Sequence, residues 1–68
     1  MSNYLIALVS DSHHLMNEPY FYKKVYKVEA VDKEEANKSL DYLIRMFSLE
    51  FSVPLINVNH LWTCKIKA

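Results

Sequence analysis

The chain contains no glycine in its 68 residues. The absence excludes glycine-rich phosphate loops of both the Rossmann and the P-loop type. It also excludes hairpin turns built on glycine. Wherever the backbone needs a positive φ, we therefore expect Asn or Asp to supply it.

Cysteine, net charge and long apolar runs are also scarce. The single cysteine, Cys64, excludes an internal disulfide. Basic and acidic residues number 8 each, which disfavours electrostatic capture of nucleic acid because that mode needs a basic surplus. No apolar run is long enough for a transmembrane helix, and the start of the chain lacks the features of a signal peptide. We therefore expect a soluble, cytoplasmic protein with no membrane contact.

Apolar residues make up 51% of the chain, which is enough for one small core. Residues 1–68 are expected to form a single small domain, and a domain of this size is only marginally stable. The apolar run at residues 4–9 is typical of a central strand. Residues 20–31 predict a second strand, with Tyr22, Tyr26, Val28 and Ala30 on one face and a wetter opposite face.

Residues 25–49 predict that this strand turns directly into one amphipathic helix. Asp32 and Glu35 have the spacing of a capping box, with Asp in place of the usual Ser or Thr. The helix is expected over about residues 33–49. The residues expected to face the core recur at helical spacing; they are Ala36, Leu40, Leu43, Ile44 and Phe47.

The residues after Pro54 allow two interpretations. Residues 55–58 and 61–67 predict a hairpin with a turn at Asn59 and His60. The alternative is one long strand, because alternate residues from Ile56 to Ile66 are largely apolar. The hairpin is preferred. The expected fold is then α+β in the order β-β-α-β-β, an antiparallel sheet of about four strands with one amphipathic helix on one face.

Neither a metal centre nor a catalytic site is predicted. Four residues have side chains that can bind a metal ion: His13, His14, His60 and Cys64. Their spacing matches no zinc motif. Cys64 is instead expected to be a small core residue. Neighbouring polar residues around Asp11 do not make a catalytic triad, which is defined by geometry. A chain this short also has little room for a substrate pocket. We therefore expect no enzymatic activity and no cofactor.

Aromatic and basic residues alternate along residues 20–26. Tyr20, Tyr22, Lys23 and Lys24 have the local pattern of a platform for single-stranded nucleic acid, where bases stack on rings and lysines meet phosphates. The other interpretation is a strand with core aromatics and an edge protected by lysines. The zero net charge favours the second interpretation.

The helix carries a second apolar stripe that the core does not need. Tyr42, Met46 and Leu49 are spaced i, i+4, i+7, away from the core-facing residues. The stripe either packs at the margin of the core or makes a protein contact. The polar loop at residues 10–19, which holds Asp11, His13 and His14, is a second candidate for contact because long loops often carry function.

The segment VEAVDKEEANKSL followed by INVNHLW resembles small accessory proteins of bacteriophages and mobile elements, including some anti-CRISPR proteins. The resemblance covers roughly half the chain and concerns the fold. It implies a non-enzymatic inhibitor or modulator that occupies the surface of a host protein complex in the host cytoplasm. A homodimer is a further expectation, and the alternative function is a small domain that binds single-stranded nucleic acid through residues 20–26. The expected contact residues are Tyr42, Met46, Leu49, Tyr20, Tyr22, Lys23, Lys24, Asp11, His13 and His14.

Overall fold

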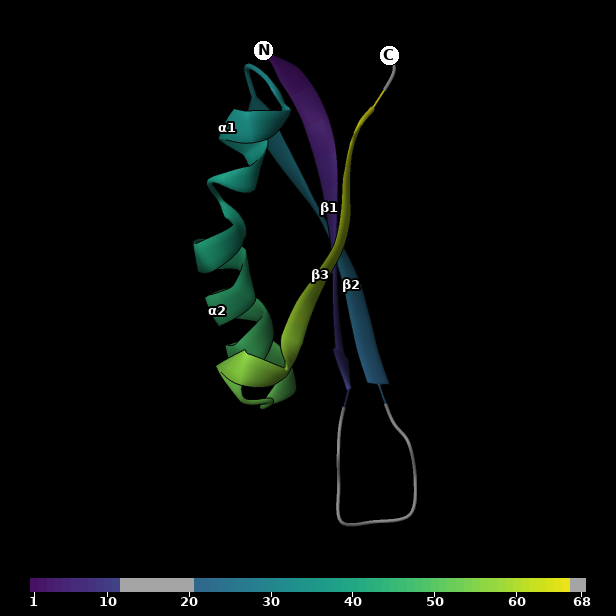
Figure 1. Ribbon diagram of the computed structural model, residues 1–68, viewed down its shortest axis with the longest axis vertical. Helices are drawn as coiled ribbons and strands as arrows, with labels where there is room; N and C mark the ends of the chain where they lie inside the picture. Colours follow the sequence, from purple (N-terminus) through teal and green to yellow (C-terminus); the bar gives the residue numbers. More distant parts are fainter. Residues whose placement is uncertain (12–20, 67–68) are drawn as a thin grey trace.

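The computed structural model describes residues 1–11 and 21–66. Within these residues the order of elements is β1 (Ser2–Asp11), β2 (Phe21–Ala30), α1 (Lys33–Asn37), α2 (Leu40–Phe51) and β3 (Val58–Lys65) (Figure 1). A short 3-10 helix, Leu55–Asn57, precedes β3. The α+β class and the helical layer on one face of an antiparallel sheet are confirmed, whereas the fourth strand is not found in the described part of the chain.

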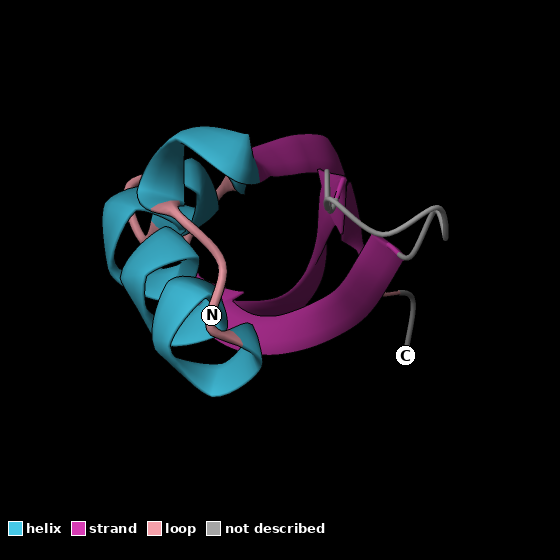
Figure 2. Ribbon diagram, turned by 90° about the horizontal axis from the view of Figure 1, so that it is seen from below, coloured by secondary structure: helices cyan, strands magenta, loops and turns pink. Residues whose placement is uncertain are grey.

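The sheet has three antiparallel strands in the order β2-β1-β3. The strand β1 lies in the centre, as its dense apolar run predicts, and it pairs with β2 from Ser2 opposite Ala30 to Asp11 opposite Phe21. Both helices lie on one side of the sheet (Figure 2). The opposite face of the sheet, which we call the helix-free face, carries no element of the described chain.

The predicted C-terminal hairpin is wrong, because β3 is one strand with a bulge. Ala7 lies opposite Trp62 and Leu8 lies opposite His60, so that Leu61 is the extra residue between them. The bulge accommodates that residue without reversing the chain. It also changes the alternation of side chains along β3. The uniform alternation predicted for one long strand from Ile56 to Ile66 is therefore not found. The residues just after Pro54 form the 3-10 helix instead of a strand, and Asn57 N–H donates to the Pro54 carbonyl at 2.9 Å.

The core lies between the helices and the helix-facing side of the sheet. The predicted core face of the helical segment is confirmed: Ala36, Leu43 and Phe47 are buried, and Leu40 and Ile44 are partly buried against them. The remaining buried members of the cluster come from the strands and from the segment that joins α2 to β3. They are Tyr4, Ile6, Leu8, Ala30, Val53 and Val58.

The helical segment begins at the predicted capping box. Glu35 N–H donates to Asp32 Oδ1 at 2.8 Å, which satisfies one of the free amides of the first turn. In return Glu35 Oε1 accepts from the N–H of Val31 at 2.7 Å, one residue earlier than the usual reciprocal partner. The predicted junction between strand and helix is therefore confirmed.

The expected single helix is instead broken after Asn37. The N–H groups of Lys38 and Ser39 donate to carbonyls three residues back, Glu35 and Ala36, at 3.0 and 3.1 Å. This tighter 3-10 pattern separates α1 from α2. Asn and Ser side chains compete for local hydrogen bonds and are weak helix formers, which favours a break at this point. Among the described residues no helix is long and apolar enough to cross a membrane.

Helix α2 ends at Phe51 and is capped by Ser52, which adopts the left-handed conformation with φ 57° and ψ 45°. Among the described residues it is the single non-glycine residue with positive φ, so serine takes the role that was expected of Asn or Asp. Val53 N–H donates back to the Ser48 carbonyl at 3.2 Å, and Ser48 Oγ donates to the Val53 carbonyl at 2.5 Å. These bonds close the helix in the manner of a Schellman motif, with Val53 packed into the core.

Ser52→Gly is expected to raise the free energy of unfolding by about 1 kcal/mol, because glycine has no Cβ to penalise the left-handed conformation. Urea denaturation followed by circular dichroism measures the change. Ser39→Gly is the matched control, since Ser39 has a φ of −81° and gains nothing from glycine. An equal gain in both variants, or no gain at Ser52, would contradict the prediction.

Candidate protein-binding surface

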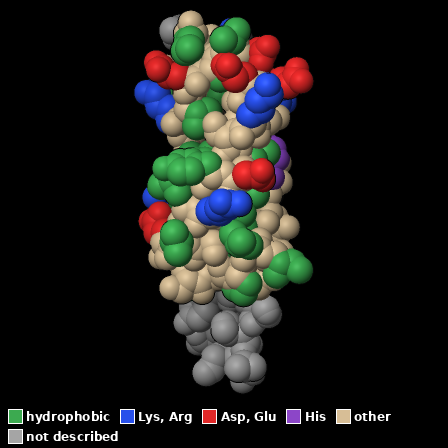
Figure 3. Space-filling model, turned by 90° about the vertical axis from the view of Figure 1, so that its left-hand side faces the viewer, with side chains coloured by type: hydrophobic (Ala, Val, Ile, Leu, Met, Phe, Trp, Pro, Cys, Tyr) green, Lys and Arg blue, Asp and Glu red, His purple; other side chains and the backbone are tan. Residues whose placement is uncertain are grey.

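The predicted second stripe of the helix is exposed. Tyr42, Met46 and Leu49, which we call the α2 stripe, have exposed fractions of 65%, 39% and 82%. The core side of the same helix holds Leu43 and Phe47, both buried. The view onto the helical layer shows hydrophobic side chains spread over it, with acidic and basic side chains between them (Figure 3). The stripe is thus an apolar surface that no described part of the chain covers.

Aromatic packing holds the C-terminal half of α2 against β2. The rings of Phe47 and Phe51 are 4.6 Å apart at a tilt of 52°. The Phe51 ring in turn stacks on Tyr22 of β2, with centroids 4.8 Å apart. Offset and tilted aromatic pairs contribute beyond the area they bury. The helix therefore presents the α2 stripe from a fixed position.

A surface ion pair joins the same two elements. Lys24 Nζ of β2 donates to Glu50 Oε1 of α2 at 2.7 Å. The hydrogen bond from Glu50 raises the pKa of Lys24 above its usual value, against a smaller opposing effect of desolvation. The Lys24 ammonium also lies 5.2 Å from the centroid of the Tyr26 ring. Lys24 is therefore engaged within the fold instead of projecting freely.

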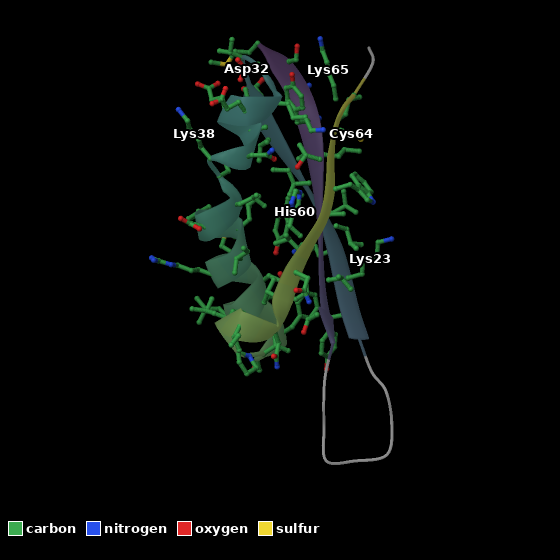
Figure 4. The ribbon with its side chains drawn as sticks, in the orientation of Figure 1. Lys23, Asp32, Lys38, His60, Cys64 and Lys65 are labelled. Carbon is green, nitrogen blue, oxygen red and sulfur yellow. The ribbon has the colours of Figure 1, made fainter. Side chains whose placement is uncertain are left out.

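The aromatic and basic residues of β2 do not form one platform. Tyr22 packs on Phe51 and Tyr26 packs against the core, both on the helix side. Within the described structure the Tyr26 hydroxyl is buried without a hydrogen-bond partner, and this burial raises the pKa of Tyr26. Lys23 is exposed and lies on the other side of the sheet (Figure 4). The strand thus separates the rings from this lysine.

The loop predicted to carry contact residues is mostly outside the described part of the chain. Of the residues assigned to this loop, Ser10 and Asp11 are instead the last two residues of β1. Tyr20, His13 and His14 lie outside the described residues, so their proposed role in contact stays a prediction.

A polar network that no sequence pattern predicted joins α1 to β3. Thr63 Oγ1 donates to Asn37 Oδ1 at 2.6 Å. His60 Nε2 lies 2.8 Å from the same Thr63 oxygen and acts as its donor, because the hydroxyl proton is already given to Asn37. The His60 side chain lies between β3 and the helices (Figure 4). With Thr63 buried, the network serves to fix α1 on the sheet.

Cys64 is exposed, so its predicted place in the core is wrong. It does share a face with Trp62, since the two lie opposite Leu5 and Ala7, but that face is the helix-free one. His60 lies opposite Leu8 on the other face. The sheet therefore keeps the thiol and the imidazole apart, and the described residues hold no group of three or more potential ligands that could bind a metal ion.

Comparisons of this chain with protein-family models, with curated proteins and with solved structures find no match. The surface of the molecule is therefore the basis for a functional argument.

Proposed function

We propose that this chain is a non-enzymatic protein-binding module, and that the α2 stripe is its contact surface. The observation that supports the proposal is the exposure of Tyr42, Met46 and Leu49 along one side of a single helix. Tyr and Met are enriched at the centres of protein interfaces. Residues at i, i+4 and i+7 lie on the same side of a helix, so these three exposed apolar side chains form one row that a partner could cover.

The spacing of the stripe suits a helix that docks into an apolar groove of its partner. Such recognition uses anchors at i, i+4 and i+7, which are the positions of Tyr42, Met46 and Leu49. A standard interface buries roughly 800 Å² on each side, and a few aromatic anchors supply most of its energy. Tyr42 is the first expected anchor. Asp41 and Arg45 are exposed on the same helix and would contribute to the polar rim.

The mode of action would be occupancy of a partner surface. The resemblance to phage accessory proteins suggests that the partner is a host macromolecular complex whose activity the module inhibits or modulates. The arrangement of β2 gives less support to nucleic-acid binding, because Tyr22 is stacked on Phe51 and Lys24 is paired with Glu50. A base would have to displace these contacts before it could stack.

The double variant Tyr42→Ala/Met46→Ala is expected to bind the partner at least about 100-fold more weakly than the wild type, since anchor residues commonly contribute 2 kcal/mol or more each. The partner is first recovered from host lysate with the immobilised wild-type chain. Its affinity for each purified variant is then measured by surface plasmon resonance.

Leu61→Ala serves as the matched control, because Leu61 is also exposed, at 50%, but lies in β3. This variant should bind like the wild type. Full affinity in a folded Tyr42→Ala/Met46→Ala variant, as judged by circular dichroism, would remove α2 from the interface. Failure of the wild type to retain any partner would count against the binding function itself.

A further inference from the structure

The two outer strands of the sheet differ in how they are protected from pairing with another chain. Both β2 and β3 have one side without a partner strand among the described residues. The pairing of β3 with β1 is interrupted by the bulge opposite Ala7 and Leu8, and bulges hinder the approach of a further strand. The pairing of β2 with β1 runs without a shift over 10 residues that include no proline. The edge of β2 is therefore the regular one.

We propose that the free edge of β2 pairs with β2 of a second copy of this chain, antiparallel, about a two-fold axis that passes between the two Tyr26 residues. An outer strand that is long and regular is a ready template for another strand. Lysines on such an edge ordinarily oppose self-pairing, so the register must be one in which they do not face one another. The charges of β2 select such a register.

The longest two-fold pairings place the axis on one of the four central residues, 24–27. With Lys24 or Lys27 on the axis, that lysine would lie directly opposite its own copy. With Val25 on the axis, Lys23 would lie opposite Lys27 of the second copy, and symmetry would repeat the clash. Like charges directly opposite one another destabilise an antiparallel pair. Three of the four central registers are therefore disfavoured.

In the fourth register, with Tyr26 on the axis, no lysine lies opposite another lysine. Lys23 then lies opposite Glu29 of the second copy, and symmetry forms this oppositely charged pair twice. Both residues are exposed on the same face of the sheet, at odd positions of β2. Lys24, which is held by its own Glu50, lies opposite the apolar Val28. Opposite charges across a strand pair are stabilising, so this register combines the fewest clashes with two favourable pairs.

The resulting dimer is closed. The joined sheet has six strands in the order β3-β1-β2-β2-β1-β3, and its outer strands are the two bulged β3 strands. A two-fold interface uses the same surface on both copies and leaves no free β2 edge for further growth. Because directly opposite residues lie on the same face of an antiparallel sheet, the helices of both copies lie on one face, with the α2 stripe still available.

Charge reversal provides the test. Lys23→Glu and Glu29→Lys, taken singly, should each weaken the dimer at least about tenfold, because each turns two attractive pairs into two repulsive ones. The double variant Lys23→Glu/Glu29→Lys restores opposite charges and should recover the wild-type affinity. Sedimentation equilibrium of the full chain from micromolar to near-millimolar concentration measures the association of each variant.

Lys27→Glu is the matched control. It changes the net charge by the same amount as Lys23→Glu, but its residue lies opposite Val25 in the proposed register, so the dimer should be little affected. These side chains are exposed, so circular dichroism should show an unchanged fold. A wild type that stays monomeric at every concentration overturns the proposal. The proposed register and edge are overturned if the single reversals leave the dimer affinity unchanged. They are also overturned if the double variant does not restore that affinity.

Discussion

Phe47→Ala is expected to lower the free energy of unfolding by about 3–5 kcal/mol. Phe47 is 0% exposed and is the largest fully buried side chain of the described chain. Its removal leaves a cavity between α2 and the sheet and takes away the ring contact with Phe51 at 4.6 Å. Small domains have total stabilities near the low end of about 5–15 kcal/mol, so the variant should be partly unfolded at room temperature. Urea denaturation monitored by circular dichroism measures the loss.

Leu49→Ala is the control for this prediction because Leu49 lies two residues further along the same helix and is 82% exposed. It should change the free energy of unfolding by no more than about 0.5 kcal/mol, since the side chain is already solvated and alanine is a good helix former. Similar losses in the two variants would show that α2 does not turn its Phe47 side toward the sheet.

The helical segment could be read from the sequence because its signals are local. The capping bond between Asp32 and Glu35 spans three residues, and the helical repeat of Ala36, Leu43 and Phe47 is visible in the residues themselves. Both depend on residues that lie close together in the sequence and on local helical geometry. The same repeat identified the α2 stripe, and its exposure follows from the fact that one helix on one sheet buries one side.

The C-terminal strand could not be read in the same way. The bulge at Leu61 is defined by the pairing of β3 with β1, more than fifty residues earlier in the chain, and it has no signature in the surrounding residues. The exposure of Cys64 has the same origin, because alternation tells which residues share a face but not which face the helices cover. Sequence patterns therefore predicted strand structure near the C-terminus, but not how β3 pairs or which of its faces the helices cover.

Two further contacts of the fold were also beyond sequence reasoning. Lys24 with Glu50, and Asn37 with Thr63, are each separated by 26 residues. A separation of this size gives no local signal of contact, and only the packing of α1 and α2 on the sheet brings these pairs together. The first pair changes how β2 is interpreted, because it pairs Lys24 with Glu50 within the fold.

Ile6→Ala is expected to lower the free energy of unfolding by about 2–5 kcal/mol, whereas Leu5→Ala should cost less than half as much. The two residues are neighbours in β1. Ile6 is 0% exposed and belongs to the core cluster. Leu5 is half-buried and lies opposite Lys27 and Cys64 on the helix-free face. Removal of Ile6 therefore leaves a cavity under the helices, but removal of Leu5 leaves space that water can enter.

This comparison tests how far the apolar run of β1 reflects burial. A near-continuous apolar strand is typical of a sheet that is covered on both faces, yet the described chain covers one. The proposed pairing through the β2 edge leaves the helix-free face open, so the difference between Ile6 and Leu5 should persist when the protein concentration is raised. Equal losses in urea denaturation, at any concentration, would show that the helix-free face is buried in solution and would contradict the one-sided core.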